Sequence, residues 1–364
     1  MKILQVTPYY PPHAGGIEFY VEALSQEFVA KGHEVTIATM SDQRGLPRSE
    51  ERDGIHIVRF PRMGTEAYGF PVGLGAYLLR NARRFDIIHA HNYHALPFLV
   101  TVSVCGAQAI VNPHFHGRGH TFFANLMHLV YQPVAALLLR RARAVICNSP
   151  SEAQLVTEKL GVKAERITII PNIVITARGR VHVTPPEQRD NDRCLLLSVG
   201  RLEAHKRIDR AIQALCDLPD HFHLAIIGDG KERANLEQMA ADLGLAGRVQ
   251  FLGYVTDQEL HQWYDRSNLV VTFSEFESFG RVLVEALQHQ RQVLCSPIPA
   301  FRDLANQFPE MITVVETGAD APAIANHIQA INLQARSARV DLEKFSPQQV
   351  AGNIMHVYVA ASTD

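Results

Sequence analysis

Cysteine is scarce in this sequence, and its pattern argues against a structural role. The 364 residues hold five cysteines, an odd number, and the five are widely spaced. Each lies in or beside an apolar run, which is typical of reduced, buried thiols and not of a disulfide framework or a zinc site. We therefore expect a protein of a reducing compartment, the cytoplasm, with buried thiols at Cys105, Cys147, Cys194, Cys216 and Cys295.

Features that would direct the chain to or through a membrane are also missing. The amino terminus, MKILQVTPYY, has the pattern of a short strand followed by a Pro-rich loop, and not that of a signal peptide. The longest apolar stretch, residues 95–111, is interrupted by Pro97, Gly106 and Gln108. The interruptions argue against a membrane span and predict a buried helix followed by a strand.

The net charge is only −2, but the charges are unevenly distributed. Residues 1–180 carry 19 Lys and Arg against 13 Asp and Glu, and the remainder carries 16 against 24. A basic first half indicates an anionic partner there, such as a phosphate, a lipid head group or a membrane face. The alternative is that both sets of charges are ordinary solvated surface.

A dinucleotide fingerprint is absent from the first loop, TPYYPPHAGGIEF. The loop lacks the GxGxxG pattern, and no acidic residue stands where a dinucleotide ribose would need one, so an NAD-type site is disfavoured. Gly15 and Gly16 come just before an expected helix, whose N-terminus favours an anion. Two interpretations are open: a phosphate or sugar contact, or a tight turn that needs a positive φ.

Strand and helix patterns alternate along the chain and predict parallel sheets in an α/β fold. The expected strands are residues 2–7, 33–40, 85–91, 109–115, 143–149 and 165–172, and then residues 194–200, 222–230, 248–254, 268–273, 292–296 and 310–315. The polar, Pro-containing segment between the two series, residues 174–192, is the expected linker. We predict two Rossmann-like domains, residues 1–175 and 190–344, that face each other across a ligand-binding cleft.

The segment NPHFHGRGH (112–120) places two histidines at the end of an expected strand. The spacing of His114 and His116 predicts that both lie on one face of that strand. A metal site and a histidine that faces a reaction centre are both open, although the segment has no acidic residue or cysteine to complete a metal site. The alternative is a pair of hydrogen-bonded core histidines.

The segment SVGRLEAHKRIDRAI (198–212) places two cations at the carboxyl end of a strand. A guanidinium at Arg201 and an ammonium at Lys206 suit a diphosphate, because the first binds oxygens in pairs and the second acts as a point charge. The alternative is a surface ion pair with Glu203 or Asp209.

The segment SEFESFGRVLVEALQ (274–288) carries two glutamates on either side of an expected helix start near residues 278–280. That helix end can hold a phosphate, and Gly280 lets a ligand come close. Glu277 precedes the helix and can accept hydrogen bonds from sugar hydroxyls, while Glu285 lies about 8 Å farther along the axis and can reach a second ring. The alternatives are a helix-capping contribution for Glu277 and a solvent-exposed position for Glu285.

Together these segments resemble the retaining nucleotide-sugar glycosyltransferases of family 4, which have the GT-B fold. The resemblance covers nearly the whole chain and is carried by PPHAGGIEFYVEAL, KGHEVTIAT, DIIHAH, HFHG, VICNSPSEAQLV, IIPN, SVGRLEAHKRID, IIGDGKERANLE, RVQFLGYV and the E-x7-E stretch ESFGRVLVE. It implies that the last helix, in residues 345–364, packs back on the first domain.

The resemblance also implies roles for individual residues. Arg201 and Lys206 would bind the donor diphosphate, Glu277 would approach the sugar hydroxyls, and His116 would face the donor sugar. Glu285 would hold the ribose. The donor-binding set is completed by Gly15, Gly16, Gly253, Tyr254, Ser278, Phe279, Gly280, Arg281 and Val282.

The chain departs from the family pattern after the second glutamate. Where the family has a small-residue stretch with G-x-P and a Gly-Gly pair, this chain has Gln290, Gln292, Pro299 and Ala300. Ile173 replaces the usual glycine after IIPN. In the family these positions belong to the donor-sugar pocket and the interdomain hinge.

The resemblance implies hexosyl transfer to a hydroxyl with retention, without a metal or other cofactor. Charge neutralisation by the two cations would stabilise the leaving diphosphate while C1 becomes oxocarbenium-like. The acceptor would be a glycan, a lipid-linked molecule or a small molecule, and no nucleic acid partner is expected. The apolar and basic residues 122–131 and 137–143 would allow peripheral contact with the inner face of a membrane, unless they only cover the core and a helix end. A sugar-nucleotide epimerase and a non-catalytic binding protein are the alternatives.

Overall fold

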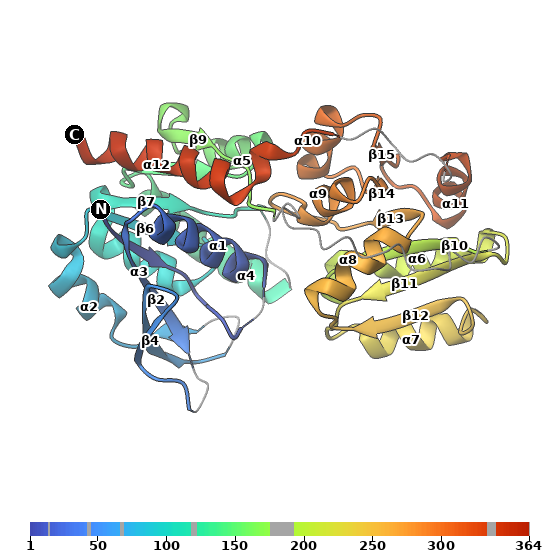
Figure 1. The fold of residues 1–364 in the computed structure, drawn as a ribbon, viewed down its shortest axis with the longest axis horizontal. Coiled ribbons are helices and arrows are strands. Elements are labelled where there is room, and N and C mark those ends of the chain that lie inside the picture. Colours follow the sequence, from blue (N-terminus) through green and yellow to red (C-terminus); the bar gives the residue numbers. More distant parts are fainter. Residues whose placement is uncertain are drawn as a thin grey trace. The chain divides into compact units, whose positions relative to one another are not determined.

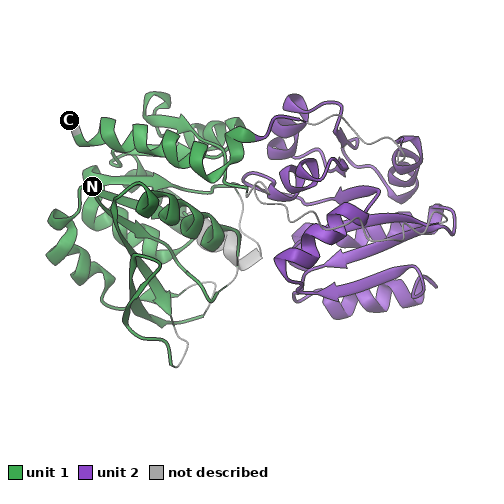
Figure 2. Cartoon of the chain, viewed as in Figure 1, with its two compact units in different colours: residues 1–175, 343–364 green, residues 176–342 purple. Residues whose placement is uncertain are grey.

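The computed structural model describes residues 1–13, 15–41, 45–65, 69–117, 122–174, 193–332 and 340–363. The chain divides into two compact units (Figure 2). Unit 1 comprises Met1–Ile175 and Glu343–Asp364, and unit 2 comprises Thr176–Leu342. Of the expected linker, residues 174–192, all but the first residue lie outside the described part of the chain.

Unit 1 is built on a mostly parallel sheet with the strand order β3-β4-β2-β1-β6-β7-β8-β9, to which β5 is added beside β4. Strands β3 and β5 pair antiparallel with their neighbour β4, and the other strand pairs among the described residues of this sheet are parallel. The strands are β1 Lys2–Val6, β2 Glu34–Ser41, β3 Ser49–Arg52, β4 Ile55–Met63, β5 Phe70–Pro71, β6 Ile87–His91, β7 Ala109–Asn112, β8 Ala144–Cys147 and β9 Ile167–Ile169.

Helices cover both faces of this sheet (Figure 1), because successive strand residues point to opposite sides. Ile3 packs in the core under α1 and α12, whereas the next residue, Leu4, packs in the core under α2 to α5. The helices are α1 Gly16–Ala30, α2 Leu74–Asn81, α3 Leu96–Cys105, α4 Phe122–Leu139, α5 Pro150–Leu160 and α12 Pro347–Thr363, with 3-10 turns η1 Ala82–Arg84, η2 Gly106–Gln108, η3 Ala164–Arg166 and η6 Glu343–Phe345. The last helix therefore belongs to unit 1.

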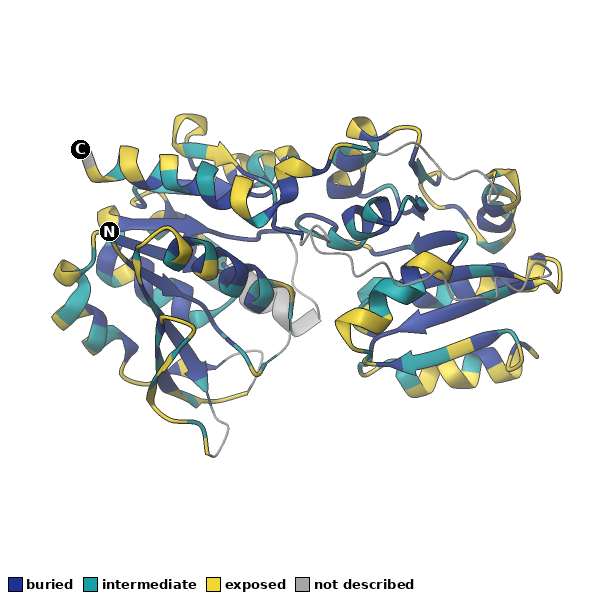
Figure 3. Ribbon diagram, in the orientation of Figure 1, coloured by how far each residue is buried: buried dark blue, intermediate teal, exposed yellow. Residues whose placement is uncertain are grey.

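Unit 2 is built on a parallel six-stranded sheet with the order β12-β11-β10-β13-β14-β15. Its strands are β10 Cys194–Val199, β11 Phe222–Ile227, β12 Val249–Gly253, β13 Leu269–Thr272, β14 Gln292–Cys295 and β15 Ile312–Val314. Its helices are α6 Ile208–Ala214, α7 Arg233–Asp242, α8 Asp257–Arg266, α9 Arg281–Gln288, α10 Pro299–Gln307 and α11 Ala321–Ala330, with 3-10 turns η4 Ala204–Lys206 and η5 Leu215–Asp217. The central strands β10, β11, β13 and β14 are mostly buried, the edge strands β12 and β15 are less so, and the outer helix faces are exposed (Figure 3).

Each sheet has one point at which the strand order reverses. In unit 1 the chain leaves β1 towards β2 and β4 and later continues from β6 in the opposite direction. In unit 2 the same reversal lies between β10 and β13. Open α/β sheets bind ligands at such switch points, outside the carboxyl ends of the strands. The loops after β1, β6, β10 and β13 are therefore the places to look for a site.

The predicted α/β class with two parallel-sheet domains is confirmed, and residues 95–111 form α3 followed by β7 as expected. Three features of the structure differ from the predictions made from the sequence. Strands β3, β4 and β5 were not predicted, Cys216 is exposed while the other four thiols are buried, and β7 ends at Asn112 and not at residue 115. Within the described ranges, every helix is too short or too polar to cross a bilayer.

Candidate functional site

The switch point of unit 2 brings a cation and a carboxylate together. The loop after β10 carries Lys206 and the loop after β13 carries Glu277, and the Lys206 ammonium forms an ion pair with the Glu277 carboxylate. The Ser274 hydroxyl donates to the same carboxylate at 3.1 Å. Burial alone would raise the pKa of Glu277, but the Lys206 ammonium and the Ser274 hydroxyl outweigh it, and the pKa lies below its usual value. Glu277 is therefore ionised at neutral pH.

Arg201 is the exposed cation of this site. It directly follows Gly200, and a Cβ built on Gly200 would lie 4.0 Å from Cε of Lys206, so the lysine side chain runs close to the start of the arginine loop. The structure shows neither of the ion pairs considered as alternatives, because Lys206 pairs with Glu277 while Asp209 receives the Arg207 guanidinium at 2.9 Å. Among the described residues, no carboxylate pairs with Arg201.

Close backbone packing fixes the loops around these side chains. A Cβ on Gly228, the residue after β11, would lie 1.9 Å from the carbonyl oxygen of Gly200, so the loops after β10 and β11 meet backbone to backbone. The His205 ring stacks on Phe276 with 4.6 Å between ring centroids, and the Glu275 N–H donates to the His205 carbonyl at 2.8 Å. These contacts join the lysine loop to the glutamate loop.

The N-terminus of α9 lies directly after the glutamate loop. The helix begins at Arg281, and its N-cap residue Gly280 has a φ of 103°, a conformation that favours glycine, and provides no side-chain capping bond. A Cβ on Gly280 would lie 2.9 Å from a ring carbon of Phe301. Glu277 lies four residues before the first helical residue, so the capping interpretation of this glutamate is wrong. Phe279 is buried beside it, while Ser278 and Val282 are half-buried.

Glu285 is held by two partners inside unit 2. The Tyr264 hydroxyl donates to Oε2 at 2.8 Å, and the Arg281 guanidinium donates to Oε1 at 2.8 Å. The carboxylate side chain is only 15% exposed, so the solvent-exposed alternative is wrong. Burial, and then the neighbouring Glu285 charge, raise the pKa of Tyr264 well above its usual value, so this hydroxyl keeps its proton and remains a donor.

The stretch that departs from the family pattern has its own hydrogen bonds. Gln290 adopts a φ of 54°, as a glycine would. The neighbouring His289 is buried, with Nδ1 2.8 Å from Asp265 and Nε2 2.9 Å from Nδ1 of His261. Pro299 and Ala300 open α10, and Ile173 is fully buried in unit 1. Residues with their own packing and hydrogen bonds therefore stand where the family pattern has small residues, and the helices and strands around them still form.

Gly253 and Tyr254 lie at the carboxyl end of β12, two strands away from the switch point. The Gly253 carbonyl accepts the Gly228 N–H at 2.8 Å, which links this position to the loop after β11. The Tyr254 side chain is 74% exposed. An exposed aromatic ring beside a strand end is compatible with stacking on a nucleotide base.

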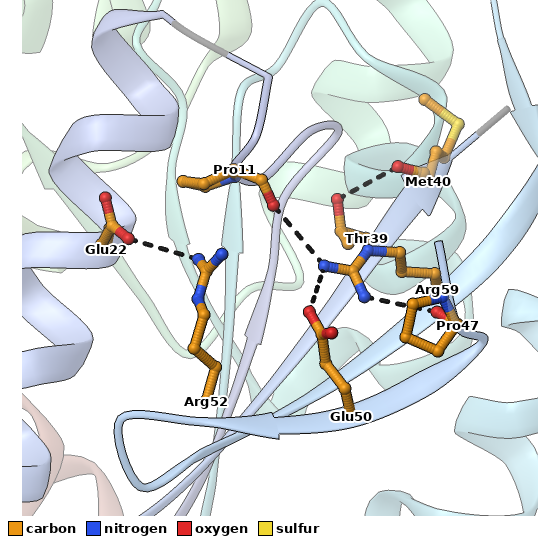
Figure 4. Close-up of polar contacts among 8 residues, drawn as sticks. All are labelled: Pro11, Glu22, Thr39, Met40, Pro47, Glu50, Arg52 and Arg59. Carbon is orange, nitrogen blue, oxygen red and sulfur yellow. Dashed lines mark hydrogen bonds and ion pairs between the residues drawn. The ribbon is translucent and has the colours of Figure 1, made fainter. Parts of the chain in front are cut away.

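The loop after β1 in unit 1 is fixed from the neighbouring strands. The Arg59 side chain is 4% exposed and donates to Glu50 at 2.6 Å, to the Pro47 carbonyl at 3.3 Å and to the Pro11 carbonyl at 3.5 Å (Figure 4). Gly15, the N-cap of α1, has a φ of −177°, which is extended backbone, so the tight-turn interpretation of the glycine pair is wrong for it. Gly16 is the first helical residue, and Ala14 lies outside the described part.

The two histidines of the segment 112–120 do not share a strand face, because β7 has already ended at Asn112. His114 has a φ of 50° and is 5% exposed, and its Nδ1 lies 2.8 Å from the Asn148 amide nitrogen. His116 is half-buried and its ring stacks on His94 at 4.5 Å. Burial lowers the pKa of His114 to about 3, so it is neutral. Among the described residues, no His, Cys, Asp and Glu side chains group into a set of three that could hold a metal ion.

Further buried histidines lie under α12. His89 Nδ1 is 2.7 Å from the Tyr358 hydroxyl, and the same hydroxyl accepts from Gln5 at 3.1 Å. His91 Nε2 is 2.7 Å from the Gln5 oxygen. Burial lowers the pKa of His89 to about 3 and that of His91 well below its usual value. These neutral rings tie the last helix to the centre of the unit 1 sheet.

Comparison of the chain with known proteins gives two consecutive family matches. The family described as Glycosyltransferase Family 4 matches residues 14–178, and the family described as Glycosyl transferases group 1 matches residues 184–348. The GPI3 subunit of phosphatidylinositol N-acetylglucosaminyltransferase from Saccharomyces cerevisiae is 23% identical over 363 residues, which cover 94% of this chain and 78% of the relative.

Solved structures share the fold over the full length. Sucrose-phosphate synthase from Thermosynechococcus elongatus has a TM-score of 0.79 and 22% identity, and the likeness covers 99% of this chain and 98% of that chain. HepE from Anabaena, solved in complex with UDP and glucose, has a TM-score of 0.71 and 21% identity over 100% and 97% of the two chains. The two parallel-sheet units therefore have the GT-B architecture of these enzymes.

Proposed function

The chain belongs to the glycosyltransferases of family 4, which have the GT-B fold, and from that premise we propose that it moves a hexosyl group from a nucleotide-diphosphate sugar to an acceptor hydroxyl, with retention and without a metal ion. The observation that carries the proposal is the arrangement at the unit 2 switch point. There Lys206 pairs with Glu277, four residues before the helix α9, whose N-cap has no side-chain hydrogen bond, and the exposed Arg201, which pairs with no carboxylate among the described residues, directly follows Gly200 at the end of the adjacent strand β10. Such a place suits a diphosphate.

In the proposed reaction the donor diphosphate binds to Arg201 and Lys206. The bond between C1 of the sugar and the phosphate oxygen breaks as a bond from C1 to the acceptor oxygen forms on the same face. The proton of the acceptor hydroxyl passes to the departing diphosphate. The two cations stabilise the negative charge that develops on the leaving group, which accounts for catalysis without a metal.

The carboxylates of Glu277 and Glu285 accept hydrogen bonds from the hydroxyl groups of the donor in this proposal. Glu277 stays ionised and so offers acceptor oxygens to the hexose, while Glu285, oriented by Tyr264 and Arg281, accepts from the ribose. Backbone N–H groups of the residues 278–282 and the exposed ring of Tyr254 complete the donor set with Gly253. In unit 1, His116 and the loop of Gly15 and Gly16 are proposed to act on the donor sugar and the phosphate.

The acceptor class is proposed only broadly, as a glycan, a lipid-linked molecule or a small molecule. The names of the relatives point to different products, a phosphatidylinositol glycoside and sucrose-phosphate. Peripheral contact with the inner face of a membrane is proposed for the end of α4, where Val134 and Leu137 are exposed next to the exposed Arg140 and Arg141. Arg140 also donates to the carbonyl of Leu160 at the end of α5, at 3.1 Å. The side chains of residues 122–130 lie outside the described part.

A transfer assay tests the proposal. The protein is incubated with UDP-glucose, GDP-mannose, ADP-glucose or TDP-glucose, with and without a panel of acceptors, and release of the nucleoside diphosphate is measured with and without EDTA. One donor should give acceptor-dependent release that survives EDTA, and proton NMR of the product should show the anomeric configuration of the donor. An inverted product, or activity that EDTA abolishes, would overturn the retaining or the metal-free part of the proposal.

A further inference from the structure

Two residues outside the set discussed so far determine where the histidine segment, residues 114–116, lies. They are Asn148, which follows β8, and Glu152, in the first turn of α5. The carboxyl group of Glu152 accepts the Phe115 N–H at 2.6 Å through Oε1 and the Asn148 N–H at 2.6 Å through Oε2. The Asn148 amide nitrogen lies 2.8 Å from Nδ1 of His114. A single buried side chain thus joins the loop after β8 to the loop after β7, at a residue 37 positions before it in the sequence.

A capping box explains only part of this arrangement. The sequence SPSE has the S-x-x-E pattern, and Ser149 caps α5 by accepting the Glu152 N–H at 3.1 Å. A capping box would also have Glu152 accept the N–H of the N-cap residue Ser149, but Glu152 accepts the N–H of the preceding residue, Asn148. The bond from the Phe115 N–H is not part of a helix cap either, because Phe115 belongs to the loop after β7.

The same helix contacts the far end of the loop. The Lys159 ammonium lies 3.5 Å from the Gly117 carbonyl, two turns after Glu152 on α5, and the Leu155 side chain lies between them, 3.6 Å from the position of a Cβ on Gly117. The carboxylate of Glu152 is almost fully buried. The segment is therefore supported by α5 from its first turn, at Glu152, to its last turn, at Lys159, and both side chains contact backbone groups of the segment.

Asn148 also determines which ring nitrogen of His114 carries the proton. The Asn112 amide nitrogen donates to Ile146 at 2.6 Å and lies 3.3 Å from Oδ1 of Asn148, so the Asn148 oxygen accepts and its nitrogen donates. Nδ1 of His114 must then be the acceptor, and the proton of the neutral ring is on Nε2. His114 is held at a positive φ that a non-glycine residue adopts only when its surroundings impose it.

We propose that Glu152 and Asn148 are positioning residues for the transfer reaction: Glu152 fixes the backbone at Phe115 and Asn148 fixes the ring of His114, and together they place the next histidine, His116, which faces the donor sugar. This inference rests on the proposed function, in which that histidine acts. Neither residue touches substrate in the proposal. Misplacement of a catalytic group by about 1 Å can cost about 100-fold in rate, so the support is expected to appear in kcat.

The test compares Glu152→Gln with Ser149→Ala. The nitrogen of a glutamine side chain donates and does not accept, because its lone pair is delocalised into the carbonyl group, so one of the two N–H groups, that of Phe115 or that of Asn148, is left without its acceptor. Ser149→Ala removes the cap of the same helix and leaves the carboxylate in place, which makes it the matched control for a loss of α5 stability. Two readouts are measured: hydrogen exchange at the Phe115 amide, and kcat and KM with the donor that the wild type uses.

We expect Glu152→Gln to speed exchange at Phe115 at least 10-fold and to lower kcat about 10- to 100-fold, with the donor KM changed less than about 3-fold. Ser149→Ala should leave both readouts near the wild-type values. Equal loss of kcat in the two variants, or wild-type exchange in Glu152→Gln, would overturn the inference. If Glu152→Gln does not fold, Asn148→Ala replaces it and should lower kcat to a similar extent by releasing Nδ1 of His114.

Failure of the proposed function and failure of this inference give different experimental results. If the wild type transfers no sugar from any of the four donors, the proposed function has failed, and hydrogen exchange still decides whether Glu152 holds the segment. If the wild type is active and Glu152→Gln is equally active, the inference has failed while the proposed function stands.

Discussion

A single buried hydroxyl, that of Tyr264, orients the second glutamate of the E-x7-E stretch. Tyr264→Phe removes the bond to Glu285 and leaves the ring in place. Because hydrogen bonds to charged groups contribute about 1.5–3 kcal/mol, we expect the donor to bind about 10- to 100-fold more weakly, as measured by isothermal titration calorimetry.

Tyr20→Phe is the matched control for this substitution. Tyr20 is also fully buried, but among the described residues its hydroxyl has no hydrogen-bond partner. Its removal should leave donor affinity unchanged. If Tyr264→Phe binds the donor as tightly as the wild type does, the hydroxyl is not what prepares Glu285 for the ribose.

The residue types at the site could be predicted from the sequence, but their pairings could not. Arg201, Lys206, Glu277 and Glu285 all stood out by their position after expected strands or near a helix start. The ion pair of Lys206 with Glu277 joins residues 71 positions apart, and its geometry depends on the adjacency of β10 and β13. Tyr264 gave no signal, because a tyrosine on a helix is usually a packing residue.

The N-terminus of α9 is the element on which the donor site depends most. Gly280→Ala would place a Cβ at a φ of 103° and 2.9 Å from the Phe301 ring, so both backbone strain and a steric clash oppose it. We expect a loss of about 2–4 kcal/mol in the free energy of unfolding, measured by urea denaturation, together with weaker donor binding.

Gly318→Ala separates backbone strain from steric clash as causes of the lost stability. Gly318 has a similar φ of 82° but open space at the Cβ position, so it carries the strain without the clash and should cost about 1–2 kcal/mol. If both alanine variants lose the same stability, the contact with Phe301 contributes nothing, and Gly280 is required only for its backbone conformation.

Element boundaries show where pattern arguments succeed and where they do not. The parallel strands could be predicted because a strand that is covered on both faces has a continuous run of apolar residues. In β4 the residues Ile55–Val58 alternate between buried and half-buried positions, a period-two pattern and not a continuous apolar run, and β3 and β5 are short and polar or Pro-containing. His114 and His116 were expected on one face of a strand over residues 109–115. The strand β7 ends at Asn112, so the alternation of side chains along a strand does not apply to them.

The molecule as a whole should lose stability unevenly on acidification. His89 and His114 have pKa values of about 3 in the folded state, against about 6.5 unfolded, so the unfolded chain takes up protons first as the pH falls below 6.5. Glu152 acts in the opposite direction: its folded pKa is raised to about 8, so its contribution is present below about 4.5 and is lost as the pH rises through 8. The pKa of His91 is also well below its usual value because of burial, and these three buried histidines outweigh one carboxyl group.

We therefore expect unit 1 to lose about 1–3 kcal/mol per pH unit between pH 6.5 and 5, at about 1.4 kcal/mol for each excess proton. Hydrogen exchange of core amides in β6 and in β13, corrected for the intrinsic effect of pH, measures each unit separately. In unit 2 the pKa of Glu277 is lowered, so its contribution is lost only below about pH 4.5. Equal losses in the two strands would contradict the assignment to the histidines.

The central claim is that the unit 2 switch point binds the diphosphate of a nucleotide-sugar. Arg201→Met tests it most directly, because this exposed guanidinium has no ion pair among the described residues and its loss should leave the melting temperature unchanged. Arg83→Met, at an exposed arginine of unit 1, is the control for overall charge. Isothermal titration with UDP-glucose, GDP-mannose, ADP-glucose and TDP-glucose should find one donor that the wild type and Arg83→Met bind equally, and that Arg201→Met binds about 10- to 100-fold more weakly. Binding by Arg201→Met at the wild-type affinity, or binding of none of the four donors by the wild type, would contradict the account.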